Sequence, residues 1–168
     1  MPETVRKADY FYTMVPDKAG EGARILKVLR DAGVNLRAFS GFPEGRKSQL
    51  DFVPVDSAAF LAAAKAAKIK VSRKKTCFLI DGDDRVGAMA DAIEKLATAK
   101  INVTAVDAVA TAGGRYGAIL WVKARDVGKA EAVLRARQSE RTPGSSPPAS
   151  TGRAGPNGRE PWEPPHWP

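Results

Sequence analysis

Two four-residue segments, Asp17–Gly20 and Asp84–Gly87, combine residue types that could bind a small charged ligand. Each has an acidic residue, a basic residue, a variable residue and a glycine, and apolar residues at helical spacing follow. The first N–H groups of a helix lack internal partners and lie at the positive end of its dipole, so a ligand carboxylate is attracted there. Glycine allows close approach to the backbone. Because the aspartates would repel a purely anionic ligand, the pattern favours a zwitterion.

A structural alternative explains the same residues without a ligand. Asp17 and Asp84 would cap the helices that follow. Gly20 and Gly87 would then serve the packing of helix on sheet.

Other kinds of site find no support in the composition. Cys77 is the only cysteine and His166 the only histidine, so the chain offers neither an internal disulfide nor a paired-cysteine metal site. A Ser-His-Asp triad is not indicated, and no nucleophile–base pair, carboxylate pair or phosphate loop stands out. We therefore expect no catalytic residues, no metal and no cofactor, and we do not expect an enzyme.

Charge and hydropathy limit the partners and the compartment. The net charge is +8, and the densest basic run is Lys68–Lys75. We interpret this run as a solvated strand edge rather than a polyanion contact, so we expect no nucleic-acid partner. No apolar run approaches the roughly 18 residues of a membrane span. The N-terminus has no apolar signal region, and one thiol suits a reducing compartment, so we expect a cytoplasmic protein without membrane contact.

The chain repeats itself at an offset of 67 residues, without a gap (84 − 17 = 67). "DKAGEGARILKVLRDAGVNLRAF" falls on "DRVGAMADAIEKLATAKINVTAV", so that Asn35 falls on Asn102. We expect the offset to continue into the next strand, where Phe52 falls on Ile119. A period of this length is too long for a solenoid unit and indicates duplication of a small domain.

Each repeat follows the order β-α-β-β-α-β, the ferredoxin-like arrangement. In the first repeat we expect strands at 10–15, 34–39, 49–55 and 69–71 and helices at 17–32 and 57–68. In the second we expect strands at 75–80, 101–110 and 116–123 and helices at 85–99 and 126–135. No fourth strand follows in the second repeat, which leaves an uncovered sheet edge. From residue 137 onward there is no Leu, Ile, Val, Phe, Tyr or Met, so we predict a disordered tail at 137–168.

The segments "VPDKAGEGARILKVLRDAGVNL" and "DGDDRVGAMADAIEKLATAKINV" resemble the ACT domain, a small-molecule-binding regulatory module. In that family an Asp-basic-x-Gly turn joins strand one to helix one, and an Asn between apolar residues opens strand two. The resemblance covers about Tyr10 to Ala136. It implies an α+β fold of two ferredoxin-like βαββαβ units, at 8–72 and 73–136. The units would lie side by side in a pseudo-twofold antiparallel sheet with helices on one face.

The resemblance also implies a site and a function. Ligand would lie at the seam between the units, with Asn35 facing the turn at Gly87 and Asn102 facing the turn at Gly20. The implied ligand-binding residues are Asp17, Lys18, Ala19, Gly20, Asn35, Leu36, Asp84, Arg85, Val86, Gly87, Asn102 and Val103. The chain would be an amino-acid-binding regulator or ligand sensor that acts by allosteric regulation on a protein partner. The uncovered sheet edge could join a second chain and give a homodimer.

Two alternatives remain. Each Asn could simply bond backbone at the start of a strand, and the chain could be a structural protein–protein interaction module without a ligand. The repeats also differ at one position: Gly33 ends the first helix where Lys100 stands in the second. Because a left-handed helix end favours glycine, we expect the two helix ends to be unequal.

Overall fold

The computed structural model describes residues 3–136, so the tail predicted at 137–168 lies outside the described residues. The elements are β1 (Thr4–Pro16), α1 (Glu21–Asp31), β2 (Leu36–Glu44), β3 (Lys47–Pro54), α2 (Ser57–Ala66), β4 (Lys75–Asp83), α3 (Ala88–Thr98), β5 (Val103–Thr111), β6 (Arg115–Val122), a 3-10 turn (Ala124–Asp126) and α4 (Val127–Arg135). The class is α+β, as predicted. Within the described residues, no helix has the length and apolar character that crossing a membrane requires.

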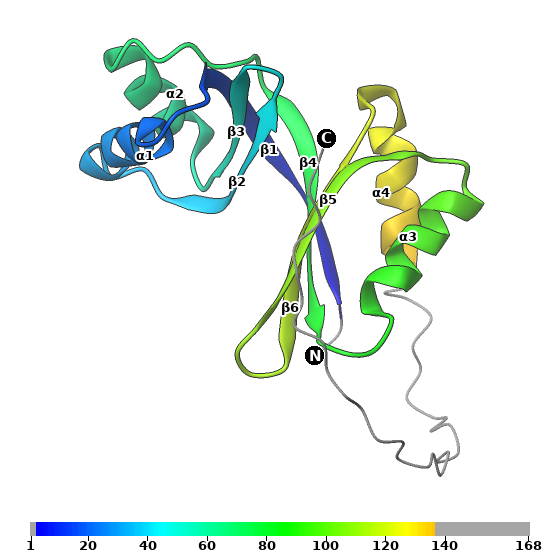
Figure 1. Cartoon of the computed structure of the whole chain (residues 1–168). Coiled ribbons are helices and arrows are strands. Elements are labelled where there is room, and N and C mark those ends of the chain that lie inside the picture. Colours follow the sequence, from blue (N-terminus) through cyan, green and yellow to red (C-terminus); the bar gives the residue numbers. More distant parts are fainter. Residues whose placement is uncertain (1–2, 137–168) are drawn as a thin grey trace, which may run out of the picture.

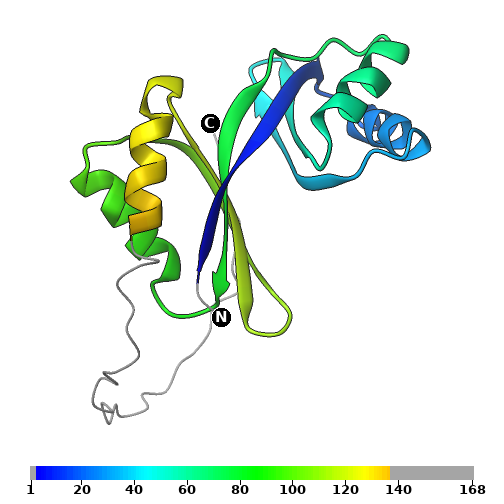
Figure 2. The same cartoon turned by 180° about the vertical axis from the view of Figure 1, so that it is seen from behind.

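All strands belong to one antiparallel sheet in the order β2-β3-β1-β4-β6-β5. Helices α1 and α2 cover one half of the sheet, and α3 and α4 cover the other half (Figures 1 and 2). Val5 packs in the core under α3 and α4, and Phe11 packs in the core under α1 and α2. Both are odd-numbered residues of β1, so they point to the same face of the strand. The helices therefore share one face of the sheet, as predicted, and we call the opposite side the helix-free face.

The long strand β1 serves both halves of the sheet. Its first part, Thr4–Tyr10, pairs with β4, and its second part, Phe11–Pro16, pairs with β3. The first part thus lies where the fourth strand of the second unit was missing. The prediction of an uncovered edge at this place is wrong, because a segment from the other end of the body fills it. The strand predicted to begin at Tyr10 begins instead at Thr4.

The segment after α2 accompanies β1 without forming a ladder strand. The hydroxyl of Thr13 donates to the carbonyl oxygen of Lys70 at 2.6 Å, and the N–H of Ser72 donates to the carbonyl oxygen of Tyr12 at 2.8 Å. The predicted strand at 69–71 is therefore wrong as a regular strand, since a side chain replaces part of the backbone pairing. Its place beside β1 is the expected one.

Apolar spacing explains how the helices pack. Helix α1 buries Ile25 and Leu29, and α3 buries Ala88, Ala92 and Leu96. Positions four apart share one helix face, so each helix directs a narrow apolar stripe onto the sheet. A third cluster lies on the helix-free face and consists of Tyr10, Val53, Cys77, Leu79 and Trp121.

A pseudo-twofold axis relates the two units. Asp9 of β1 lies opposite Thr76 of β4, and these are equivalent repeat positions (76 − 9 = 67). A strand pair in which equivalent residues oppose each other is the pattern of an antiparallel ladder on a twofold axis.

The prediction that the repeat continues without a gap is wrong for β3 and β6, the strands that follow the hairpin turn of each unit. Phe11 opposes Phe52, whereas its equivalent Phe78 opposes Leu120, so the offset becomes 68 (120 − 52 = 68). The cause is loop length: residues 44 and 47 close the β2–β3 turn, and residues 111 and 115 close the β5–β6 turn, which has one residue more. A one-residue shift moves a side chain to the other face of a strand. Phe52 accordingly packs under the helices, and Ile119 lies on the helix-free face.

The ends of α1 and α3 are alike, contrary to prediction. Gly33 has φ 71° and Lys100 has φ 57°, so both are left-handed. In each unit the next N–H, of Val34 or Ile101, donates at 2.9 Å to a carbonyl five residues earlier. The same hydrogen bonds hold both ends, so Lys100 adopts a conformation that glycine adopts more easily.

Candidate ligand sites

The turn before α3 presents an uncapped helix start. Gly87 is the N-cap, with φ 77°, and no side chain caps the helix. The first helical hydrogen bond runs from the N–H of Asp91 to the carbonyl of Gly87 at 3.2 Å. The N–H groups of Met89 and Ala90 lie in the first turn, where a helix supplies no carbonyl for them. Capping by Asp84, the structural alternative, is wrong for this helix.

The turn before α1 has the same design. Gly20 is the N-cap, with φ 93° and no side-chain cap. The Asp17 carboxylate instead accepts a hydrogen bond from the hydroxyl of Ser48 on β3, at 2.9 Å. Capping by Asp17 is therefore also wrong, because β3 holds this side chain away from the helix. Both glycines have a positive φ that other residues rarely adopt, which explains their recurrence in the repeat.

Around the second turn the predicted residues line a hollow of about 280 Å³. Asp84, Arg85 and Gly87 contribute from the turn, and Ala108 and Val109 contribute from β5. The Arg85 guanidinium bonds the carboxylate of Asp91 in the first turn of α3, and this bond raises the pKa of Arg85. Val86 points away and is fully exposed. The hollow therefore combines helix N–H groups, a fixed cation and the Asp84 carboxylate.

The two asparagines lie elsewhere. Asn35 lines a different hollow with Gly33, Leu36 and the end of α1, and it shares no lining residue with the hollow at Gly87. Its side-chain oxygen accepts from the N–H of Leu36 at 2.9 Å, which is the backbone bonding that the alternative reading gives it. Asn102 is exposed just before Val103, the first residue of β5. The start of β2 and the turn before α3 lie in different units at opposite ends of the molecule (Figure 1). The chain therefore does not bring Asn35 to the turn at Gly87.

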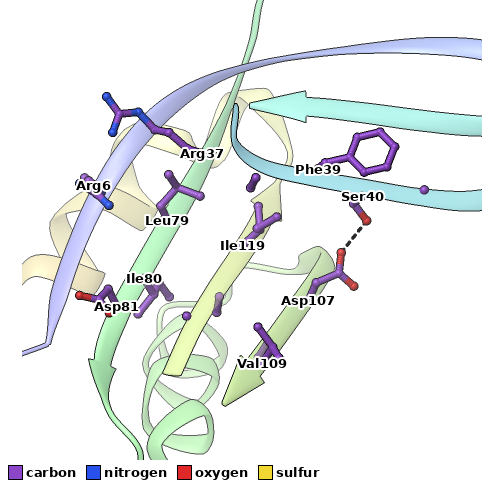
Figure 3. Close-up of a pocket in the computed structure, with 15 residues that line it drawn as sticks. Arg6, Arg37, Phe39, Ser40, Leu79, Ile80, Asp81, Asp107, Val109 and Ile119 are labelled. Atoms are coloured by element: carbon purple, nitrogen blue, oxygen red, sulfur yellow. Dashed lines mark hydrogen bonds between the residues drawn. The ribbon is translucent and has the colours of Figure 1, made fainter. Parts of the chain in front are cut away.

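A third hollow, of about 660 Å³, lies on the helix-free face between β2 and the strands of the second unit. Figure 3 shows Arg6 and Arg37 toward one end of it, and Ser40 and Asp107, which are hydrogen-bonded to each other, toward the other end. Sequence reasoning missed this hollow, because it forms only where the two edge strands approach each other. One signal available in the sequence was Gly117, a glycine inside a mostly apolar strand.

A buried carboxylate lies beside this contact between the edge strands. Asp51 on β3 is 4% exposed and accepts a hydrogen bond from the amide of Gln49 at 2.9 Å. Burial raises the pKa of Asp51, the bond from Gln49 and the charge of Lys75 oppose the rise, and the charge of Asp107 adds to it. The Lys75 ammonium lies 5.1 Å from the ring centre of Tyr12. This part of the helix-free face is therefore polar as well as packed.

No protein family and no curated protein matches the sequence. Solved structures do match the fold. Protein BT0572 from Bacteroides thetaiotaomicron is 16% identical with a TM-score of 0.71, over 80% of this chain and 90% of that one. The ligand-free regulatory subunit of aspartate kinase from Thermus thermophilus is 19% identical with a TM-score of 0.57, over 83% of this chain and 97% of that one.

The same subunit from Thermus flavus is 20% identical, again with a TM-score of 0.57, over 82% of this chain and 95% of that one. The chain has the fold of aspartate kinase regulatory subunits. This likeness supports the ACT-type fold implied by the sequence and extends over almost the whole length of those subunits. At these sequence identities the likeness shows the fold alone, so the ligand has to be inferred from the residues of the site.

Proposed function

We propose that the chain is a non-catalytic regulatory module that binds an amino acid or a similar small zwitterion at the turns before α1 and α3. The carrying observation is that both helices begin on a left-handed glycine without a side-chain cap. The ligand carboxylate would accept from the first N–H groups of the helix, and the neighbouring aspartate would accept from the ligand ammonium. The likeness to regulatory subunits of aspartate kinase fits this role.

A second copy of the chain would complete the sites. The open edges of the sheet are β2 and β5, and α1 and α3 are the helices that precede them. Pairing of two copies along such an edge would create the seam in which the ligand lies, with the partner's Asn opposite the turn. Strand β5 suits this role, because Val106 and Val109 are exposed and Asp107 is its only charged residue. The ligand would then link dimer geometry to a regulated protein in the cytoplasm.

Titration calorimetry of the full chain against each common amino acid tests the proposal. We expect one or a few to bind, and we expect Gly87→Leu to weaken binding by at least about tenfold, because the side chain occupies the place of the carboxylate. Light scattering with and without that amino acid should show a dimer. Absence of binding by every amino acid would refute the proposal.

Matched control variants separate the loss of the binding site from the backbone strain of replacing a glycine at positive φ. Gly45 in the β2–β3 turn also has positive φ, 62°, and belongs to the other unit, so Gly45→Leu imposes similar backbone strain away from the second site. Gly113→Leu, at φ 80° in the β5–β6 loop, is the equivalent control for Gly20→Leu. Binding should survive in both controls.

The second candidate is an interaction module without a ligand. The observation that favours it is the same exposed strand β5, which could pair with a strand of another protein. In that case Val109→Lys would abolish partner binding, while the glycine variants would leave it unchanged.

A further inference from the structure

The hollow on the helix-free face joins the two units. Ala38 and Ser40 on β2 form one wall, Leu79 on β4 and Ile119 on β6 form the floor, and Asp107 on β5 forms part of the opposite wall. The Ser40 hydroxyl donates to the Asp107 carboxylate at 2.7 Å and ties the walls together (Figure 3). The volume of the hollow, about 660 Å³, is within the range of small-molecule pockets.

A glycine keeps part of this hollow open. Gly117 of β6 lies opposite Asp81, and at the equivalent place in the first unit Gln49 of β3 lies opposite Met14 (81 − 14 = 67). The Gln49 side chain reaches Asp51 and fills its half of the helix-free face. Gly117 leaves the corresponding space open in the second half.

Neither backbone conformation nor packing requires that glycine. Gly117 is not among the residues with positive φ, and a Cβ there would meet only the carbonyl oxygen of Ile80, at 4.0 Å. By contrast, a Cβ on Gly41 would lie 3.1 Å from the side chain of Leu50. A glycine inside a strand weakens the strand, and close approach of a ligand is one reason to keep one.

The net charge at the rim is positive. Asp81 is paired with Arg115 at 2.5 Å, which leaves Asp107, hydrogen-bonded by the neutral Ser40 hydroxyl, as the one lining carboxylate without a cationic partner among the described residues. Among residues 3–136, neither Arg6 nor Arg37 has a carboxylate partner. Both lie on the same side of the hollow in Figure 3. Arginine is suited to carboxylate and phosphate because its planar guanidinium donates two parallel hydrogen bonds.

We propose that this hollow is a second binding site, for an organic anion whose acid group is carried on a compact apolar body. Arg6 and Arg37 bind the acid group, and Leu79, Ile119 and Ala38 contact the apolar body. Because the walls come from both units, the bound anion fixes the contact between β2 and β5. The site uses none of the turn residues, so it does not depend on the function proposed above.

Amide chemical shifts of the full chain, titrated with benzoate, phenyl phosphate, inorganic phosphate and neutral benzamide, test the proposal. We expect benzoate or phenyl phosphate to shift the amides of Ser40, Leu79 and Gly117, and the stronger of the two identifies the acid group. Inorganic phosphate and benzamide should bind at least about tenfold more weakly, since each lacks one half of the recognition. Equal responses to all four probes, or shifts that avoid this face, would overturn the proposal.

Two variants probe the two halves of the site. Gly117→Gln reproduces the side chain of the first unit and should abolish the shifts. Arg37→Gln, on the exposed rim, should fold normally and weaken binding by roughly tenfold, the loss of one charge-assisted bond. Gly87→Leu and Gly20→Leu should leave the titration unchanged, whatever they do to amino-acid binding. Retained affinity in Arg37→Gln would contradict the assigned role of the arginines.

Discussion

Ser40 and Asp107, equivalent positions in the two repeats, are joined by a 2.7 Å hydrogen bond across the helix-free face. They lie on β2 and β5, which are the two edges of the sheet and are separated by four other strands. The sheet twist therefore brings its own edges together on the pseudo-twofold axis that also passes between Asp9 and Thr76. The two positions are equivalent in the repeat, but one holds a hydroxyl donor and the other a carboxylate acceptor. The hydrogen bond therefore runs in one direction across the pseudo-twofold axis.

This bond should couple the two units. In a double-mutant cycle of Ser40→Ala and Asp107→Ala, we expect a coupling free energy of roughly 0.5 kcal/mol in urea unfolding, modest because the pair is partly solvated. The Ser48 hydroxyl donates to Asp17 rather than to Asp107, so the effect of Ser48→Ala should simply add to that of Asp107→Ala. Strict additivity in the Ser40 cycle would contradict the coupling.

The first part of β1 should stabilise the second unit. Val5 is buried among residues of α3, α4, β4 and β6, so Val5→Ala should lower the free energy of unfolding by roughly 1–3 kcal/mol. Hydrogen exchange should accelerate first in β4, its pairing partner. Thr4→Ala, at an exposed position, should have little effect. If Val5→Ala instead loosened α1 and β2, the assignment of this segment to the second unit would be wrong.

Lys100 offers a gain in stability. It holds φ 57°, which is costly for a residue with a side chain, and Gly33 holds the same place in the first unit. Lys100→Gly should raise the free energy of unfolding by roughly 0.5 kcal/mol, the relief of strain minus the added flexibility of the unfolded chain. Gly33→Lys should lower it by a similar amount. Urea midpoints measure both changes, and a loss of stability in Lys100→Gly would refute the argument.

Asp51 should make stability depend on pH. Burial raises its pKa in the folded protein above the value of about 3.9 in the unfolded chain. A raised folded-state pKa means that its contribution is fully present below pH 4 and is lost as the pH rises through the folded pKa. Asp51→Asn cannot ionise, so relative to the wild type it should become more stable as the pH increases from 3 to 7. Urea unfolding across this range measures the free energy of unfolding of both proteins. If the two free energies changed with pH in parallel, the raised pKa of Asp51 would be contradicted.

The sequence predicted the repeated local structure. Apolar residues at helical spacing, such as Ile25 and Leu29, located the helices, because burial of one face needs only local periodicity. The glycines at 20 and 87 marked the turns, since few other residues adopt their left-handed backbone. The order βαββα of each unit followed from these elements, and the likeness to known structures agrees with the ferredoxin-like fold. The ligand-binding residues remain a prediction.

Only the tertiary structure decided how the two units share strands and surfaces. The filling of the missing strand by Thr4–Tyr10, the extra residue before Arg115 and the contact of Ser40 with Asp107 each depend on pairing between segments far apart in the chain. Hydrophobic periodicity identifies the buried face of an element but not the strand beside it. The sequence by itself therefore determined the elements of each unit and the two turns, and long-range pairing and sheet twist determined the shared strand and the hollow on the helix-free face.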